Sequence, residues 1–397
     1  MPSLRTLDGV DVEGKRVLLR ADFNVPVENG KVADVTRIAR TAPTILDIAA
    51  RGGKVILLSH FGRPKGPDRK DSLKPLVPAI ADVLGRPVAF GEDCIGEKAR
   101  AAVNAMRPGD VLCLENTRFH PGEERNDPDF VAQLAALGDI FVNDAFSVSH
   151  RAHASVEGLG HRLPAYAGRD LVEEVEALDR VLETPAHPLA AIVGGAKVSS
   201  KLDLLGNLIA KVDTLIIGGG MANTFLAALG KPVGKSLCER ELTASACDIL
   251  ERAERERHEI VLPVDVVVAR ELEANAPARE AGVERVEADE IILDIGRRSI
   301  EQVCSVLART RTLVWNGPLG AFETQPFDNG TVEVAEAAAE LASAGKLVAV
   351  AGGGDTVAAL HAAGVAERFT YVSTAGGAFL EWLEGKPLPG LEILMVR

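Results

Sequence analysis

Residues 17–26, V-L-L-R-A-D-F-N-V-P, pass from a short apolar run straight into a cluster of polar side chains. Similar apolar runs occur at residues 55–59, 111–114 and 140–143, and again in the second half at 189–193, 214–218, 264–269, 312–316 and 347–351. Nearly continuous apolar character over so few residues is typical of strands buried on both faces of a parallel sheet. With longer amphipathic stretches between the runs, each half is predicted to be a doubly wound α/β domain.

Length and charge limit the kinds of partner. The chain has 397 residues, 47% of them apolar, which is enough for two domains with cores of their own. Its formal net charge is −13, which argues against a nucleic-acid or anionic-membrane surface, because such partners need a broad basic field. Any anion site must therefore be a local cluster of basic residues.

The cysteines and the N-terminus indicate a cytoplasmic protein. The five cysteines are odd in number and widely spaced, and no C-x-x-C occurs, so neither a disulfide framework nor a zinc site is indicated. The first residues have no apolar signal region, and no run of about 18 apolar residues occurs. Secretion and membrane spanning are therefore not expected.

One helix is expected to join the two halves. Between residues 168 and 183 the apolar positions 171, 175, 178 and 182 share one helical face, and Thr184-Pro185 then stops the helix. The predicted domains are residues 1–168 and 185–383, with an interdomain helix at 169–184. The tail at 384–397 follows a loop rich in glycine and proline.

The two halves carry different polar motifs after their strands. The first half presents side chains, in R-A-D-F-N-V-P from Arg20, S-H-F-G-R-P-K-G from Ser59, E-N-T-R-F from Glu115 and S-H-R-A-H-A-S from Ser149. The second half presents glycines, in G-G-A-K at 194–197, G-G-G at 218–220, W-N-G-P-L-G-A-F-E at 315–323 and G-G-G-D-T at 352–356. Arginines grip a small anion, whereas glycines let backbone N–H groups approach a polyphosphate. Two ligands are predicted, one for each half.

Several cations of the first half are candidates for binding a small phosphorylated acid: Arg37, His60, Arg63, Arg118 and Arg151. Any one of them alone is better explained as a surface or helix-capping cation. Together they are better explained as a pocket, because most of them follow predicted strands, where open sheets bind ligands. Asp22 and Asn24 either close a turn before Pro26 or contact substrate hydroxyls.

In the second half, Lys197 and Lys201 are four residues apart and are expected on one helix face, where they are either solvated or reach a transferring phosphoryl group. The glycine triplets read as tight turns or as phosphate loops. Asp355 and Thr356 directly after the second triplet favour a phosphate loop, since a carboxylate beside phosphates commonly holds Mg²⁺.

Other nucleotide motifs fail. The stretch ending at Gly234-Lys235-Ser236 has Leu229 where a P-loop needs its first glycine, and no segment fits G-x-G-x-x-G. No G-x-S-x-G or H-E-x-x-H occurs, so assignment as a serine hydrolase or a metallohydrolase is disfavoured.

Taken in order, the motifs above resemble those of the phosphoglycerate kinase family over essentially the full length of the chain. The resemblance implies two Rossmann-like lobes with 3-phosphoglycerate on the first and Mg-ADP or Mg-ATP on the second, a C-terminal tail packed on the first lobe, and a monomer. It assigns substrate binding to Asp22, Asn24, Arg37, His60, Arg63, Arg118 and Arg151. It assigns the nucleotide to Gly195, Lys197, Lys201, Gly219, Asn316, Pro318, Glu323, Gly352, Gly353, Gly354, Asp355 and Thr356, with the metal at Asp355.

Catalysis is assigned by the same resemblance to Arg37, Lys197, Lys201, Gly353 and Gly376. Ala375 stands where the family usually has a glycine, which puts the local backbone conformation in question. The implied reaction moves a phosphoryl group between 1,3-bisphosphoglycerate and ADP after the lobes close by a hinge near the joining helix. Two alternatives remain at this point: an unrelated carboxylate kinase, and a non-enzymatic phosphosugar sensor or scaffold with the same fold.

Overall fold

A computed structural model describes residues 3–28, 30–182 and 184–396 of the chain. By their internal contacts these residues divide into two compact units. The first unit runs to Glu176 and takes in the chain again from Pro387, and the second unit is Ala177–Lys386. In the described residues, no helix has the length and apolar character needed to cross a membrane.

The first unit is built on a six-stranded sheet in which every pair of neighbours is parallel. Its strands, in spatial order, are β5 (Ala89–Gly91), β6 (Val111–Leu114), β4 (Lys54–Leu58), β1 (Arg16–Arg20), β7 (Ile140–Asn143) and β8 (Ala165–Ala167). A two-stranded hairpin follows β1 and consists of β2 (Val27–Glu28) and β3 (Lys31–Val32).

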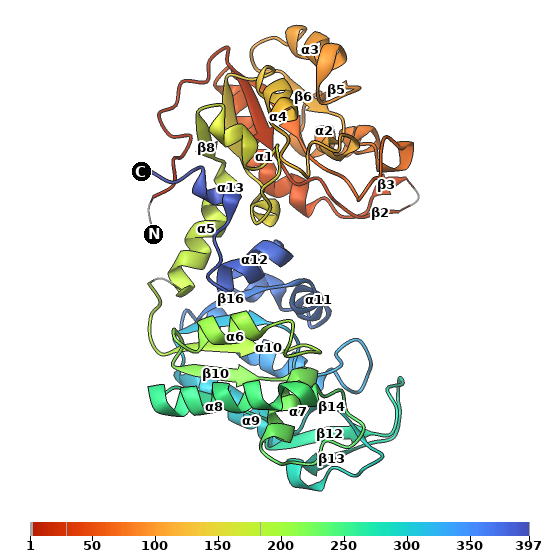
Figure 1. Ribbon diagram of the computed structural model, residues 1–397, viewed down its shortest axis with the longest axis vertical. Helices are drawn as coiled ribbons and strands as arrows, with labels where there is room; N and C mark the ends of the chain where they lie inside the picture. The colour runs from red at the N-terminus through yellow and green to blue at the C-terminus, as the bar shows by residue number, and fades with distance from the viewer. Residues whose placement is uncertain (1–2, 29, 183, 397) are drawn as a thin grey trace. The chain divides into compact units, whose positions relative to one another are not determined.

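Helices bury both faces of this sheet (Figure 1). Val17 and Leu19 of β1 pack with α1 (Thr36–Ala50) and α2 (Val77–Leu84) in one apolar core, while Leu18, which points the other way, is also fully buried. Two further helices of the unit are α3 (Gly96–Asn104) and α4 (Pro128–Ala135). Burial on both faces explains why the strand runs are apolar at almost every position.

The C-terminal tail belongs to the first unit. The short helix α13 (Pro389–Glu392) lies within it, and the Gly390 amide donates to the Ser149 carbonyl at 2.9 Å. Asn143 Nδ2 donates to the Gly390 carbonyl at 3.0 Å, and the Arg5 amide donates to the Leu394 carbonyl at 2.8 Å. Backbone hydrogen bonds and the Asn143 side chain therefore hold the tail against the end of β7, the segment after it and the N-terminal segment.

The second unit has its own six-stranded parallel sheet. Its strands, in spatial order, are β11 (Glu259–Val261), β10 (Thr214–Ile217), β9 (Leu189–Val193), β15 (Thr312–Asn316), β16 (Val348–Gly352) and β17 (Tyr371–Ser373). On one face α9 (Arg297–Arg309) and α10 (Asn329–Ser343) enclose Trp315, and α6 (Leu202–Leu208) and α8 (Thr243–Glu256) lie on the other (Figure 1). The remaining helices are α7 (Gly219–Ala228), α11 (Gly354–Ala362) and α12 (Gly376–Leu383).

The two-domain α/β prediction is confirmed, but one predicted strand lies in a different sheet. Residues 264–269 were expected to continue the parallel rhythm. Their strand β12 (Asp265–Ala269) instead pairs antiparallel with β13 (Ala278–Gly282) and β14 (Ile291–Ile295) in a separate three-stranded sheet. A buried apolar run looks the same in either kind of sheet, so its sequence does not reveal its partners.

The structure contains the helix predicted between the two halves, but it does not place the two lysines on a helix as predicted. The predicted helix is present as α5 (Arg169–Leu182), with Leu171 and Leu178 fully buried, and position 183 lies outside the described residues. The prediction that Lys197 and Lys201 share a helix face is wrong, because α6 begins only after Lys201 and Lys197 precedes it in irregular backbone.

Candidate active site

Polar side chains follow four neighbouring strands of the first sheet at their carboxyl ends. Asp22 and Asn24 come after β1, His60 after β4 and Arg118 after β6, and Arg151 lies in the segment after β7. Because these strands are parallel and adjacent, their carboxyl ends lie along one edge, where open α/β sheets bind ligands. We call the polar groups at this edge the cationic edge.

Asp22 and Asn24 tie the loops of the cationic edge together. Asp22 Oδ2 accepts hydrogen bonds from Arg37 Nη1 at 2.8 Å and from Ser147 Oγ at 2.6 Å. Asn24 Oδ1 accepts from the Gly62 amide at 2.9 Å, and the Asn24 carbonyl accepts from Arg37 Nη1 at 3.0 Å. The guanidinium of Arg37 is therefore positioned by neighbouring side chains and backbone.

His60 is a neutral imidazole at this edge. It is 4% exposed, and burial, followed by repulsion from Arg20, Arg118 and Arg151, holds its pKa well below the usual value. Arg20 Nη2 lies 3.1 Å from His60 Nδ1, and since a guanidinium only donates, Nδ1 accepts and the ring proton is on Nε2. The 3.9 Å separation from Asp22 Oδ1 is then no ion pair. His60 can donate one N–H to a ligand.

Positive charge accumulates around His60. Burial and then Arg118, Arg20 and Arg151 lower the pKa of His153 to about 4, and burial and Arg151 lower the pKa of His150 to about 4. The pKa of Arg118 is itself lowered, by burial first and by Arg151 second. A bound anion would relieve this repulsion and form charge-assisted hydrogen bonds with the guanidinium groups.

Arg63 differs from the other expected substrate residues. It is exposed, and it takes no part in the contacts described above. Two residues that the sequence interpretation missed do take part. Arg20 is 1% exposed and contacts both His60 and Ser155, and Ser147 donates to Asp22. Arg20 could have been recognised, because it is a charged residue at the end of an otherwise apolar strand. Nothing in the sequence distinguished Ser147.

In the second unit, three loops meet main chain against main chain at the carboxyl edge of the sheet. Gly194 follows β9, Gly219 follows β10 and Gly317 follows β15. A Cβ on Gly194 would lie 1.9 Å from the Pro318 carbonyl oxygen, and a Cβ on Gly219 would lie 2.8 Å from the Gly195 nitrogen. Only glycine permits such an approach, which is the arrangement that phosphate-binding loops use.

Lys201 ties two of these loops together. Its Nζ donates to the Gly194 carbonyl at 2.6 Å, to Asn316 Oδ1 at 2.6 Å and to the Asn316 carbonyl at 3.1 Å. Burial lowers the pKa of Lys201 to about 8, and the Asp355 carboxylate opposes that shift. These hydrogen-bond acceptors are neutral, so they do not cancel the positive charge of the ammonium. That charge can therefore attract an anion.

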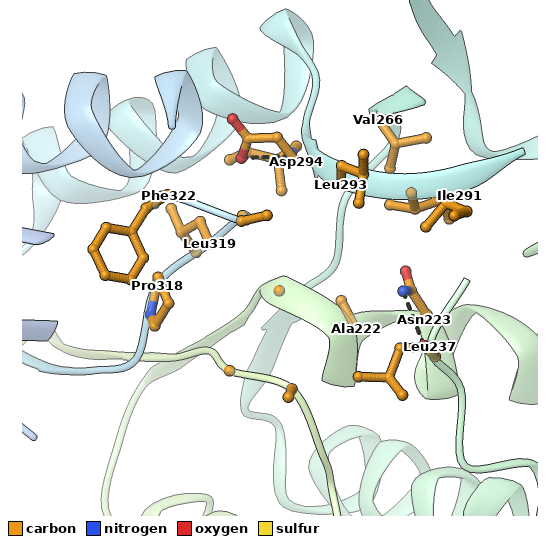
Figure 2. Close-up of a pocket in the computed structure, with 18 of the residues that line it drawn as sticks. Ala222, Asn223, Leu237, Val266, Ile291, Leu293, Asp294, Pro318, Leu319 and Phe322 are labelled. Atoms are coloured by element: carbon orange, nitrogen blue, oxygen red, sulfur yellow. Dashed lines mark hydrogen bonds between the residues drawn. The ribbon is translucent and has the colours of Figure 1, made fainter. Parts of the chain in front are cut away.

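A cavity of about 720 Å³ opens beside the glycine loops, within the size range of small-molecule sites. Five expected nucleotide residues line it: Gly195, Gly219, Pro318, Glu323 and Asp355. Apolar side chains form its walls, and Figure 2 shows Leu237 and Ala222 on one side with Ile291 and Leu293 on the other. Apolar walls facing each other suit a flat ring. These wall residues were missed, because isolated apolar positions carry no signal in sequence.

The loop after β16 adds a carboxylate. Asn316 Nδ2 donates to the Gly352 carbonyl at 2.8 Å, and the amide following Asn316 donates to Thr356 Oγ1 at 2.7 Å. Gly353 has φ +98° and precedes α11, which carries Asp355 in its first turn. Asp355 is exposed and lines the cavity. A carboxylate in this position is the kind of ligand that Mg²⁺ takes together with phosphate oxygens.

The other expected residues of the second unit are less closely tied. Lys197 and Gly354 are exposed. Gly376 has φ +38° and opens α12, as expected from the sequence. Ala375 has φ −88° and ψ 7°, which is ordinary backbone for any residue, so the alanine there requires no rearrangement.

A cationic edge on one parallel α/β unit and a glycine-lined cavity of nucleotide size on another define a two-domain α/β phosphotransferase. The phosphoglycerate kinase family model matches residues 7–386. The chain is 63% identical over 395 residues to the phosphoglycerate kinase of Rhodopseudomonas palustris, covering 100% of this chain and 99% of the relative. It is 62% identical over 393 residues to that of Bradyrhizobium diazoefficiens, covering 99% of each.

Solved structures of the same family are also similar to this chain. The phosphoglycerate kinase of Coxiella burnetii matches with a TM-score of 0.92 at 42% identity, covering 99% of both chains. That of Pyrococcus horikoshii matches with a TM-score of 0.83 at 30% identity, covering 98% of both. The chain belongs to the phosphoglycerate kinase family, and it is a glycolytic kinase whose family acts on phosphoglycerate and adenine nucleotides with magnesium.

Proposed function

We propose that residues 1–168, together with the tail at 384–397, bind 3-phosphoglycerate or 1,3-bisphosphoglycerate, that residues 185–383 bind Mg-ADP or Mg-ATP, and that residues 169–184 form the hinge. The proposed phosphoglycerate ligands are Asp22, Asn24, Arg37, His60, Arg63, Arg118 and Arg151. The positive charge around the neutral His60, which Asp22, Glu123 and Glu124 offset only in part, is the observation that carries this assignment.

The nucleotide is proposed to lie in the cavity with its ring between the apolar walls and its phosphates toward the glycine loops. Two observations support this placement: the volume of about 720 Å³ and the Lys201 ammonium beside the Gly194 and Asn316 oxygens. Mg²⁺, held by Asp355 and by phosphate oxygens, would neutralise part of the phosphate charge when bound.

The reaction needs no general base. In the direction that consumes ATP, the nucleophile is a carboxylate of 3-phosphoglycerate, which is ionised at neutral pH because its pKa is about 4. The barrier is repulsion between two anions, so the protein must align them and neutralise charge. We assign this work to Arg37, Lys197 and Lys201 and to the backbone at Gly353 and Gly376, after closure of the hinge excludes water.

We further propose a monomeric, cytoplasmic enzyme without a nucleic-acid or membrane partner. The five cysteines are free thiols, which is compatible with a reducing compartment. The formal charge of −13 disfavours polyanionic partners.

A pair of arginine variants tests the assignment of the phosphoglycerate site. Arg118→Ala removes a buried cation that also donates to the Gly62 carbonyl at 2.8 Å, and it should raise the KM for 3-phosphoglycerate at least tenfold. The Kd for ADP should stay within twofold of the wild-type value.

Arg16→Ala is the matched control. Arg16 begins β1, at the opposite end of the strand from Asp22, and pairs with Asp139 at 2.6 Å. It should leave both constants unchanged. Turnover would be measured by coupling ADP formation from 3-phosphoglycerate and Mg-ATP to NADH oxidation. An unchanged KM in Arg118→Ala, or acetate replacing 3-phosphoglycerate equally well, would reject the site as assigned.

A further inference from the structure

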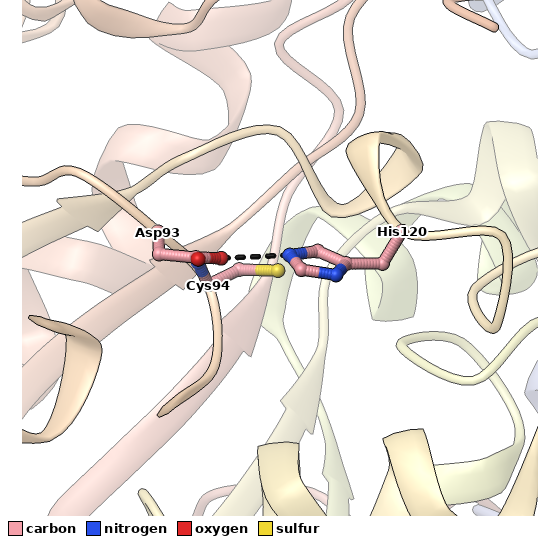
Figure 3. A group of neighbouring side chains, drawn as sticks. All are labelled: Asp93, Cys94 and His120. Carbon is pink, nitrogen blue, oxygen red and sulfur yellow. Dashed lines mark hydrogen bonds and ion pairs between the residues drawn. The ribbon is translucent and has the colours of Figure 1, made fainter. Parts of the chain in front are cut away.

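Asp93, Cys94 and His120 form a cluster outside the proposed substrate sites. Asp93 and Cys94 follow β5, and His120 follows the short helical turn Thr117–Phe119, so residues distant in sequence meet in the first unit. His120 Nε2 lies 2.7 Å from Asp93 Oδ1, and one ligand-type atom from each of the three side chains lies within 4.8 Å of the others. Figure 3 shows the Cys94 sulfur pointing toward the imidazole.

The separations suit a small metal ion. Atoms bound about 2.0–2.3 Å from one Zn²⁺ ion lie roughly 3–4 Å from one another in tetrahedral geometry. Donors that are 2.7 Å apart for the Asp93–His120 pair, and within 4.8 Å for the whole cluster, need only small side-chain rotations to reach that spacing. The hydrogen bond between Asp93 and His120 would then be replaced by two bonds to the ion.

The surroundings hold the donors in place and favour a cation. The Cys94 amide donates to Asp93 Oδ1 at 2.7 Å, and the His120 ring packs against Phe130 with 5.4 Å between ring centres. Cys94 is fully buried, whereas the side chains of Asp93 and His120 are 37% and 30% exposed, which leaves an approach from solvent. Glu115 and Glu123 also act electrostatically on Cys94, so the local field is negative.

We propose that Asp93, Cys94 and His120 form a binding site for a borderline transition-metal ion of the Zn²⁺ type, with water as the fourth ligand. One sulfur, one nitrogen and one oxygen donor favour Zn²⁺ or Co²⁺ and disfavour Mg²⁺, which prefers oxygen. Such an ion would link the loop after β5 to the loop after β6. The proposal is independent of the assigned substrate and nucleotide sites.

Binding requires the Cys94 thiol to lose its proton to solvent as the metal–sulfur bond forms. Burial, with help from Asp93, raises the pKa of this thiol well above its usual value. The neutral thiol therefore persists without metal, and we expect weaker binding than at structural sites with several thiolates.

The test is titration of the metal-free full-length protein with Co²⁺ and then Zn²⁺, in excess Mg²⁺ to block oxygen-only sites. We expect one Co²⁺ ion per chain to produce a thiolate-to-cobalt charge-transfer absorption, which Zn²⁺ then abolishes. Absence of the charge-transfer band in the wild-type protein would overturn the proposal.

Variants identify the ligands. Cys94→Ser should abolish the absorption band, and His120→Ala and Asp93→Asn should each weaken Zn²⁺ binding at least tenfold. His120→Ala alters a partly exposed side chain, so it keeps the test valid if Cys94→Ser fails to fold.

His187→Ala is the matched control, because His187 Nδ1 pairs with Asp213 Oδ2 at 2.6 Å, yet no group of three ligating side chains includes it within the described residues. It should retain wild-type Zn²⁺ binding. Equal loss in His187→Ala and His120→Ala, or unaltered binding in Cys94→Ser, would contradict the site.

Discussion

Raising the pH should switch off the enzyme through one partly buried lysine, Lys201. Burial lowers the pKa of Lys201 to about 8, while Nζ is held by the Gly194 carbonyl and by two oxygens of Asn316. A lysine with a lowered pKa loses its charge at a lower pH than an ordinary lysine. Activity that needs the ammonium is therefore full well below pH 8 and is lost above it.

The size of the effect follows from the pKa. With a pKa of about 8, half of the lysines are charged at about pH 8 and about a tenth at pH 9, so kcat/KM for the nucleotide should fall about fivefold between them. The shift from 10.5 corresponds to about 3 kcal/mol of unfavourable charging, which phosphate binding can recover. Substrate phosphates have a second pKa of about 6 and are already ionised in this window.

The assay is the pH dependence of kcat/KM for Mg-ATP from pH 6.5 to 9.5, with coupling enzymes in excess. Lys201→Arg keeps a cation beyond this range and should lose the decline. Lys201→Met should lower turnover by about 10²- to 10³-fold with no inflection near pH 8. Lys346→Met alters an exposed lysine in the turn that follows α10, and it should reproduce the wild-type profile.

Two results would refute the reasoning. A wild-type profile that is flat through pH 9 would show that the charge of Lys201 is not needed or that its pKa is not lowered. An identical decline in Lys201→Arg would assign the titration to another group.

Three further predictions concern single positions. Arg37→Ala should lower turnover by roughly 10²-fold. The Kd for ADP, measured by calorimetry, should change less than twofold, because Arg37 contacts Asp22 and Asn24 of the first unit. Turnover equal to that of the wild type would refute the assigned role. Gly194→Ala places a Cβ 1.9 Å from the Pro318 carbonyl oxygen and should destabilise the second unit by about 1–3 kcal/mol or more in urea unfolding, whereas Gly206→Ala in α6 has open space and should not destabilise it. Asp144 is buried, and burial raises its pKa from 3.8 to about 7, so the wild type should lose stability as pH rises through this window, and Asp144→Asn should gain up to about 4 kcal/mol relative to it between pH 4 and pH 8; parallel stability curves in urea would contradict this.

Most strands were predictable because a parallel sheet buries both faces of each strand. The runs at 17–20, 111–114 and 189–193 are apolar at nearly every position, and the observed strands agree with them to within a residue. The three-residue strands β5, β8, β11 and β17 were not recognised, since so short a run has no distinctive pattern.

Two errors arose where a local pattern has more than one outcome. Residues 264–269 form a buried strand in an antiparallel sheet, and strand partners are set by tertiary contacts rather than by the run itself. Lys197 and Lys201 have helical spacing, but the loop after β9 stays irregular through Lys201 because its backbone packs against the loop after β15.

The amino-acid sequence alone determined the two parallel α/β domains, the joining helix and the family, because apolar periodicity and ordered motifs are local properties of a chain. Only the tertiary structure decided the charge states of the site residues and which distant side chains meet. The neutral state of His60, the lowered pKa of Lys201 and the meeting of Cys94 with His120 all depend on burial and on distances between residues far apart in sequence. The apolar walls of the cavity come from scattered positions for the same reason, since a cavity exists only where separate segments pack around a space.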